Sequence, residues 1–180
     1  MKRVLVPLAD GFEEIEAITT IDILRRAEIE VVIAGLNGDS ATGNHGITVG
    51  CDTHLDDVSG TFDMLALPGG MPGAKHLRES EAIQQRVKAM HGAEKWVAAI
   101  CAAPMAIAAS GVLDGAKATS YPGFLDEFPN VEHTGALVEK DGAFITARGP
   151  GAALDFALEL VETLRGKAVR DEVEGRLQRP

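Results

Sequence analysis

The chain has 180 residues, of which 46% are apolar and 24% charged, and its 17 basic and 27 acidic side chains give a formal net charge of −10. This length is enough for one domain with its own core, so we expect a single domain over residues 1–180. The acidic balance argues against direct contact with nucleic acid, and no apolar stretch approaches the ~20 residues of a membrane-spanning helix.

Strands and helices alternate along the whole sequence. Near-continuous apolar runs indicate strands buried on both faces, and apolar residues three or four positions apart indicate helices. In chain order, the expected elements are a strand at 4–8, a helix through Leu24, a strand at 31–36, a hairpin or irregular excursion within 37–50, a strand at 63–67, a helix at 81–91, a strand at 96–100, a helix through Ala109, short strands at 117–120, 137–138 and 144–147, and a helix at 152–164.

This alternation predicts an α/β fold, with a mainly parallel sheet between two layers of helices. The first helix is expected to begin with a capping box formed by Asp10 and Glu13. At the other end of the chain, segment 167–180 mixes basic and acidic side chains, which favours a solvated helix or tail.

Candidate functional residues fall where the predicted strands end. Ligands of open parallel sheets bind beyond the carboxyl ends of the strands. Segment 10–16, the pair Gly69-Gly70 and Cys101 all lie at such ends. We therefore expect these three segments to meet at one edge of the sheet.

Cys101 is the candidate nucleophile. It ends a buried strand and precedes a helix, whose positive end is expected to lower the thiol pKa from about 8.5. Backbone N–H groups at the same turn would also stabilise an oxyanion or an oxidised sulfur. The alternative is that Cys101 acts only as a small buried hydrophobe. With two cysteines in all and no Cys/His cluster of zinc-ligand spacing, we expect a reducing, cytoplasmic location and no metal.

Three carboxylates, Glu13, Glu14 and Glu16, follow the first strand. A solvated helix N-terminus explains Glu13 and Glu14, because the helix dipole favours negative charge there. It explains Glu16 less well, since this residue stands between Ile15 and Ala17. Turned toward Cys101, Glu16 would share a proton with the thiol and act as its acid/base partner.

The remaining candidates carry weaker signals. The glycines of 69–73 permit a tight turn with positive φ and would present backbone donors to a substrate. Arg148 either marks the entrance of the last helix or helps to hold the site together. Cys51 has no obvious base nearby and is interpreted as structural or as part of an interface. None of the histidines is placed near Cys101 by the sequence.

Four blocks of the sequence resemble the ThiJ/PfpI family, most closely the branch of YajL and the human Parkinson's-disease-associated deglycase. The likeness runs from about Lys2 to Gly166, and the blocks are Ala9-Asp10-Gly11-Phe12-Glu13-Glu14-Ile15-Glu16, Leu67-Pro68-Gly69-Gly70, Ala98-Ala99-Ile100-Cys101-Ala102-Ala103-Pro104 and Thr146-Ala147-Arg148-Gly149-Pro150-Gly151. The resemblance implies a flavodoxin-like sandwich and a homodimer.

The same resemblance implies roles for particular residues. The reactive cysteine is Cys101, its partner glutamate is Glu16, and the backbone amides that line the sulfur are those of Gly70 and Ala102. Peptidase-like and amidase-like relatives place a histidine directly after the nucleophile, where this chain has Ala102.

Two further departures from the family pattern concern the surroundings of the site. A histidine that some relatives place near the pocket is replaced by Tyr121, and an arginine of the hairpin falls at or near His45. These two changes leave the substrate preference open.

Two functions follow as hypotheses. The first is a glyoxalase or deglycase that needs no cofactor and acts on 2-oxoaldehydes such as methylglyoxal, or on their glycation adducts, through Cys101 and Glu16. The second is a sensor of oxidative stress or a chaperone, in which oxidation of Cys101 is the signal. A cysteine peptidase or amidase is disfavoured by Ala102.

Overall fold

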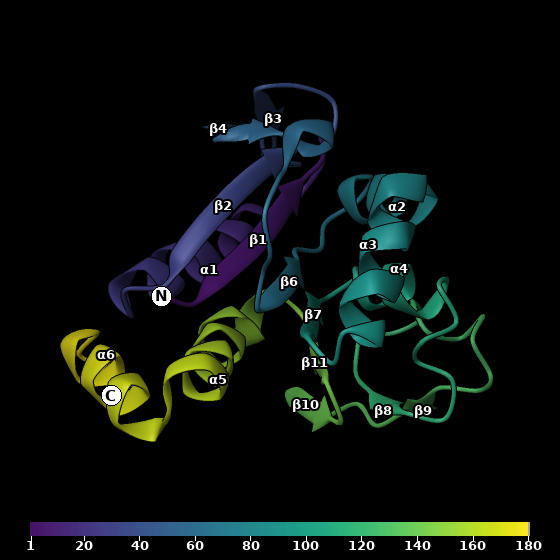
Figure 1. The fold of residues 1–180 in the computed structure, drawn as a ribbon. Helices are drawn as coiled ribbons and strands as arrows, with labels where there is room; N and C mark the ends of the chain where they lie inside the picture. The colour runs from purple at the N-terminus through teal and green to yellow at the C-terminus, as the bar shows by residue number, and fades with distance from the viewer. Residues whose placement is uncertain (180) are drawn as a thin grey trace.

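The computed structural model describes residues 1–179 and places a seven-stranded sheet at the centre of the molecule (Figure 1). The strand order is β10-β11-β7-β6-β1-β2-β5. The bounds are β1 (Arg3–Leu8), β2 (Glu30–Gly35), β5 (Thr53–His54), β6 (Met64–Leu67), β7 (Trp96–Ile100), β10 (Val138–Asp141) and β11 (Phe144–Ala147). Within the described residues every pairing in this sheet is parallel except that of β10 with β11.

Helices cover both faces of the sheet, as the sequence predicts. They are α1 (Glu14–Arg26), α2 (Gly73–Glu79), α3 (Glu81–Gly92), α4 (Pro104–Ala108), α5 (Ala153–Arg165) and α6 (Lys167–Arg176), with 3-10 turns η1 (Leu55–Asp57) and η2 (Pro150–Ala152). Among the described residues, no helix combines the length and the apolar character that crossing a membrane requires.

Alternation along the central strands produces two apolar cores. In β1, Val4 and Val6 pack into the core under α1 and α5, whereas Leu5 packs into the core under α2, α3 and α4. Strand β6 divides in the same way, with Met64 on the first face and Leu65 on the second. Because successive side chains of a strand point to opposite faces, an uninterrupted apolar run serves both cores at once. The predicted α/β sandwich is therefore confirmed.

Two small sheets accompany the main one. Strands β3 (Ser40–Thr42) and β4 (Thr48–Gly50) form the antiparallel hairpin expected within 37–50. Strand β8 (Lys117–Ala118) pairs with β9 (Glu132–His133) outside the main sheet. Helix α2 and strands β5 and β9 were not expected, because they are short and carry few apolar residues in a periodic pattern.

The first helix begins later than the predicted capping box. Glu13 is the N-cap residue, and its side chain accepts a hydrogen bond of 2.8 Å from the Glu16 amide. Asp10 instead accepts from the Thr42 amide at 2.8 Å and so joins the first loop to the hairpin. The chain turns away at Gly11, with φ +84°, where an added Cβ would lie 2.3 Å from Pro72. Only glycine allows this close passage, and the helix starts after it.

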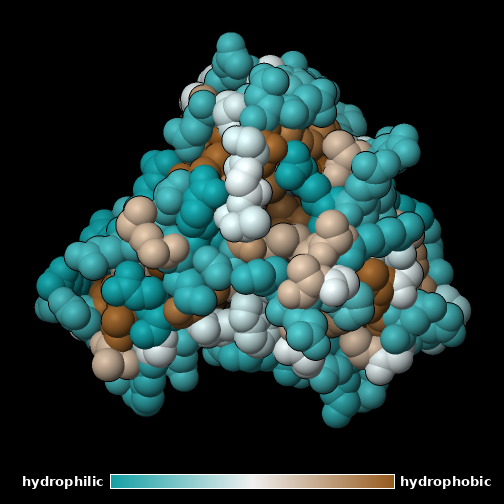
Figure 2. All heavy atoms as spheres, viewed as in Figure 1, coloured by the Kyte–Doolittle hydropathy of each residue, from teal (hydrophilic) through white to brown (hydrophobic). Residues whose placement is uncertain are grey.

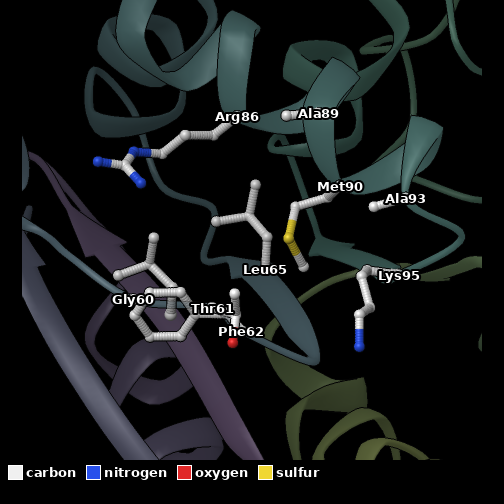
Figure 3. Close-up of a pocket in the computed structure, with 10 residues that line it drawn as sticks. Gly60, Thr61, Phe62, Leu65, Arg86, Ala89, Met90, Ala93 and Lys95 are labelled. Carbon is white, nitrogen blue, oxygen red and sulfur yellow. The ribbon is translucent and has the colours of Figure 1, made fainter.

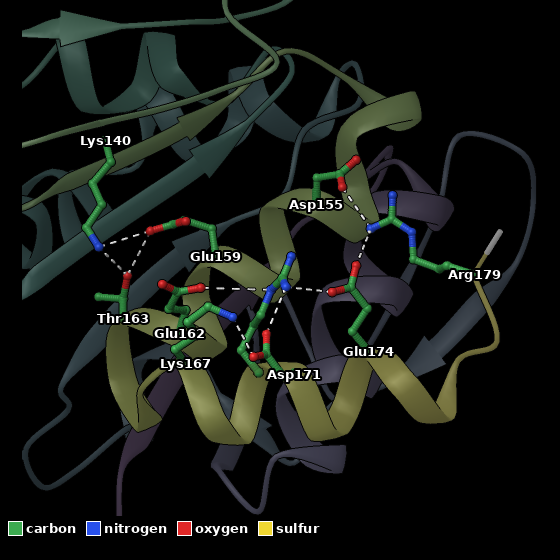
Figure 4. A network of polar contacts seen from close by, with 10 residues as sticks. Lys140, Asp155, Glu159, Glu162, Thr163, Lys167, Asp171, Glu174 and Arg179 are labelled. Atoms are coloured by element: carbon green, nitrogen blue, oxygen red, sulfur yellow. Dashed lines mark hydrogen bonds and ion pairs between the residues drawn. The ribbon is translucent and has the colours of Figure 1, made fainter.

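The C-terminal segment folds into α6 and is not a free tail. Val173 is buried against α5, and Arg170 lies 2.6 Å from Glu174 and 3.8 Å from Glu162 of α5. Figure 4 shows Glu162 of α5 and Glu174 of α6 in this charged region. Arg179 lies 2.8 Å from Asp155 of α5. Helix α6 therefore matches the expected helix but docks against its neighbour.

Candidate active site

Cys101 lies at the carboxyl end of β7, in a strained turn that leads toward α4. Its φ is +63°, a left-handed conformation that residues other than glycine adopt rarely and at a cost of roughly 1 kcal/mol or more. Two backbone hydrogen bonds hold this turn, from Cys101 N to Ala147 O at 2.9 Å and from Tyr121 N to Cys101 O at 2.8 Å. The side chain is nearly buried, with 8% of the residue exposed. Strain that the surroundings enforce in this way is typical of functional positions.

Glu16 approaches from the first turn of α1 and is completely buried. Its Oε2 accepts a hydrogen bond of 2.9 Å from the Gly69 amide. Its Oε1 has no partner in hydrogen-bonding geometry among residues 1–179, yet the carboxyl group and the Cys101 thiol lie close enough to shift each other's pKa. A buried, half-satisfied carboxyl group is costly, so its presence points to a role beyond stability.

Gly69 and Gly70 allow these two side chains to meet. A Cβ on Gly69 would lie 2.5 Å from Glu16 Oε2 and 2.7 Å from the Cys101 Cβ. Gly70 has φ +88° and passes so close to the first loop that an added Cβ would lie 2.3 Å from Glu13 N. The tight turn with positive φ predicted for 69–73 is therefore found at Gly70. It lies at the sheet edge where the site residues were expected to meet.

The electrostatics of the pair are dominated by burial. Burial raises the pKa of the Glu16 carboxyl to about 7, against the opposing effects of the thiol and the Gly69 amide. Burial, followed by the charge of Glu16, raises the pKa of the Cys101 thiol to about 12. The Ala102 and Gly70 amides act on the sulfur in the opposite direction and favour its ionised form.

The expected lowering of the Cys101 pKa by a helix dipole is therefore wrong. Helix α4 begins only at Pro104 and has five residues, so its dipole is weak beside the effect of burial. Because an ionised Glu16 opposes ionisation of the thiol, protonation of Glu16 favours the thiolate and the two groups titrate as a pair.

Glu13 and Glu14 are not the solvated carboxylates that the sequence favours, since each residue is only 6% exposed. Glu14 binds the hairpin: its Oε1 accepts from the His45 amide at 2.7 Å and its Oε2 lies 2.9 Å from His45 Nδ1. The ligand atoms of Glu13, Glu14 and His45 lie within 4.8 Å of one another, which is the arrangement by which they could hold a cation. The hydrogen bonds of these residues already give them a structural role when no cation is bound.

Cys51 follows the hairpin and is half-buried. Burial raises the pKa of its thiol, and the charges of Asp52, Asp39 and Asp10 add to this effect. These three acidic neighbours disfavour a thiolate, and no carboxyl–thiol pair like that of Cys101 forms there. The structural or interface role predicted for Cys51 stays a prediction.

A cavity of about 380 Å³ is lined by residues near Tyr121 and Arg148, and Cys101 is not among them. Tyr121, Arg148 and Pro150 are among its lining residues, and the Tyr121 amide is the group bound to the Cys101 carbonyl. Tyr121 is half-exposed, and its ring would lie 3.3 Å from a Cβ on Gly149. The structure thus gives Arg148, which the sequence left undecided, a place beside the cavity.

A family model matches residues 2–163, and it describes the DJ-1/PfpI family. The chain belongs to this family. The Parkinson disease protein 7 homolog of Danio rerio is 40% identical over 182 residues, which cover 98% of this chain and 96% of that protein. A Pyrococcus abyssi protein named as a deglycase is 36% identical over 166 residues, covering 91% of this chain and 99% of its own. The crystal structure of Drosophila melanogaster DJ-1beta superposes with a TM-score of 0.95 at 40% identity, and the match covers 98% of this chain and 97% of that one.

Membership of the DJ-1/PfpI family confirms the resemblance carried by the four sequence blocks. Within the described residues, the chain places a tyrosine where the resemblance suggested a pocket histidine, and its hairpin His45 is bound to Glu14. The strained φ of Cys101 had no sequence signal. The close approach at Gly69 had one, because a glycine pair at a strand end is where a tight contact is expected.

Proposed function

We propose that this DJ-1/PfpI family member is a glyoxalase or deglycase that needs no cofactor and acts on 2-oxoaldehydes such as methylglyoxal or on their glycation adducts. The proposal rests on one observation, the buried Glu16 carboxyl beside the Cys101 thiol. The relative named as a deglycase supports the same reaction class. We keep the cytoplasm as the expected location.

The first step is formation of a hemithioacetal. Glu16, as the carboxylate, takes the Cys101 proton while the sulfur attacks the aldehyde carbon and a C–S bond forms. The amides of Gly70 and Ala102, which favour negative charge on the sulfur, would also hold the developing oxyanion. The proton on Glu16 then passes to that oxygen, and the carboxylate is regenerated.

The second step moves a proton between two carbons. Glu16 takes the hydrogen from the carbon bound to sulfur, giving an enediol, and returns it to the neighbouring carbon, which leaves a thioester. Water then cleaves the C–S bond and releases the 2-hydroxy acid and the thiol, so methylglyoxal and water together give lactate. A carboxyl group with a pKa of about 7 suits this work, because general acid–base catalysis is most efficient near the operating pH.

The test measures lactate formation from methylglyoxal with purified protein. We expect turnover in the wild type and in Cys51→Ser, and none in Cys101→Ser. Equal turnover in all three proteins, or loss in Cys51→Ser alone, would contradict the assignment. Deglycase activity is measured separately, on a thiol compound glycated by methylglyoxal.

A second candidate, a redox sensor, is favoured by the same amides. A Cys101 sulfinate would carry a permanent charge, which the Gly70 and Ala102 amides and a protonated Glu16 would bind. Mild peroxide should then stop at the sulfinic acid and raise the melting temperature. Direct oxidation to the sulfonic acid, or a lower melting temperature, would remove the physical basis of this candidate.

The expected homodimer is also part of the proposal. Ile15 and Ile18 on α1 and Ile47 on the hairpin are 57%, 41% and 56% exposed. Glu14 ties the start of α1 to the hairpin, so these apolar side chains belong to neighbouring elements. We expect a dimer by analytical ultracentrifugation and a monomer after Ile18→Glu.

A further inference from the structure

A second cavity, of about 250 Å³, lies at the opposite edge of the sheet from Cys101. Its residues belong to the amino ends of the strands, since Phe62 precedes β6 and Lys95 precedes β7, whereas Cys101 follows β7. Helix α3 forms the other wall, with Ala89 and Met90. Figure 3 shows Leu65 and Met90 extending into the space between the loop before β6 and α3.

The lining of this cavity is mostly apolar. Its apolar part consists of Leu5, Phe62, Leu65, Ala89, Met90 and Ala93. Figure 2, viewed from the same side as Figure 1, shows apolar surface near the middle of this face with polar side chains around it. An apolar cavity with a few polar groups at its border is the usual form of a small-molecule site.

Two cations border the cavity, Arg86 on one side and Lys95 on the other (Figure 3). Arg86 donates one hydrogen bond of 3.0 Å to the Leu55 carbonyl, and within residues 1–179 no carboxylate pairs with it. Lys95 lies 3.5 Å from Asp63, but Asp63 is also 3.4 Å from Lys2. The Arg86 and Lys95 side chains at the border of the cavity therefore have N–H groups free to bind an anion, in a chain whose net charge is −10.

We propose that this cavity binds a small organic anion with an apolar body, such as an aryl or short-chain carboxylate. The apolar body would fill the space between Leu65 and Met90, and the carboxylate would bind Arg86, whose planar guanidinium suits that group. The size of the cavity limits the ligand to roughly a single ring with a short acid chain. The site is separate from the one proposed for catalysis and needs no turnover to be detected.

The test is an NMR titration of the ¹⁵N-labelled protein with phenylacetate, with 2-phenylethanol as the neutral analogue of similar size. We expect shifts at Leu65, Ala89 and Met90, and an affinity for the acid about fivefold or more above that for the alcohol. Arg86→Gln should remove this preference. Lys88→Gln, an exposed change on the same helix that does not line the cavity, should leave it intact.

A blocking variant gives a second measurement. Ala89 is exposed on α3, so Ala89→Leu should fill the cavity without disturbing the core and should weaken both ligands. Alkylation of Cys101 should leave the titration unchanged. Shifts confined to Tyr121 and Arg148, equal affinity for acid and alcohol, or an unchanged preference in Arg86→Gln would each overturn the proposal.

Discussion

Ionisable side chains meet in two very different regions of this molecule. At the carboxyl edge of the sheet, Glu16 is fully buried beside Cys101, and burial alone is the largest influence on both pKa values. On α6, Arg170 and Glu174 form an ion pair at 2.6 Å, yet their side chains remain 29% and 26% exposed. Water screens the second region and not the first. Burial, and not the number of ion pairs, therefore decides where an ionisable group has chemical consequences.

The largest expected effect is on turnover at the buried region. Glu16→Gln keeps the size of the side chain but cannot accept the thiol proton, so methylglyoxal turnover should fall by about 100-fold or more. Glu13→Gln is the matched control, because its amide oxygen can still accept the capping hydrogen bond from Glu16 N and its charge is a smaller influence on the Glu16 pKa than burial. The test is the rate of methylglyoxal turnover of the two variants at neutral pH. Equal losses of turnover in both would contradict the role of Glu16 as the acid/base group.

Gly69→Ala should have the next largest effect. The new methyl group would enter the space between Glu16 and Cys101, where atoms lie 2.5 and 2.7 Å from its position. Overpacking of this kind costs about 1–3 kcal/mol and should also displace the pair. Urea denaturation and the rate of Cys101 alkylation report the two effects. Gly50→Ala, where nothing lies within 4 Å, is the control and should leave both unchanged.

Stability should depend on pH through Glu16. Its folded pKa of about 7 lies above its usual value of 4.5, so the folded state binds the proton more tightly than the unfolded chain does. The stabilisation is complete below about pH 4.5 and is lost as the pH rises through about 7, on the order of 3 kcal/mol in total. Denaturation midpoints of the wild type should fall over this range relative to those of Glu16→Gln. Parallel curves for the two proteins would contradict the raised pKa.

The exposed region should give the smallest effect. Arg170→Gln removes an ion pair with Glu162 of α5 and another with Glu174 inside α6, and we expect it to lower the free energy of unfolding by less than about 1 kcal/mol. Arg176→Gln is the control, because Arg176 pairs with Glu172 inside α6 only. Amide hydrogen exchange in α6 should become faster in Arg170→Gln and not in Arg176→Gln. A loss of unfolding free energy in Arg170→Gln larger than that in Gly69→Ala would contradict the expected order of the two regions.

The order of strands and helices could be predicted because it depends on local patterns. Apolar runs such as Val4–Leu8 report strands buried on both faces, and the rule that ligands bind beyond strand ends placed Gly70 and Cys101 at one edge. Short elements such as α2 were not predicted, because seven residues are too few to show a clear period in their apolar positions.

Features that depend on tertiary contacts could not be predicted in the same way. The left-handed φ of Cys101 is enforced by Ala147 and Tyr121, which are distant in sequence. The burial of Glu14 depends on its bonds to His45 across the hairpin. The pKa of Cys101 was expected in the wrong direction, because a sequence shows a helix start but not how much water the fold excludes.

The central claim is that Glu16 and Cys101 act as one coupled pair. The most direct test is the rate of iodoacetamide labelling at Cys101 and Cys51 as a function of pH, resolved by peptide mass spectrometry, in the wild type and in Glu16→Gln. We expect the rate of Cys101 labelling to change in a step near pH 7, where Glu16 titrates, and we expect Glu16→Gln to abolish this step while the Cys51 profile stays the same. Identical Cys101 profiles in the two proteins would contradict it.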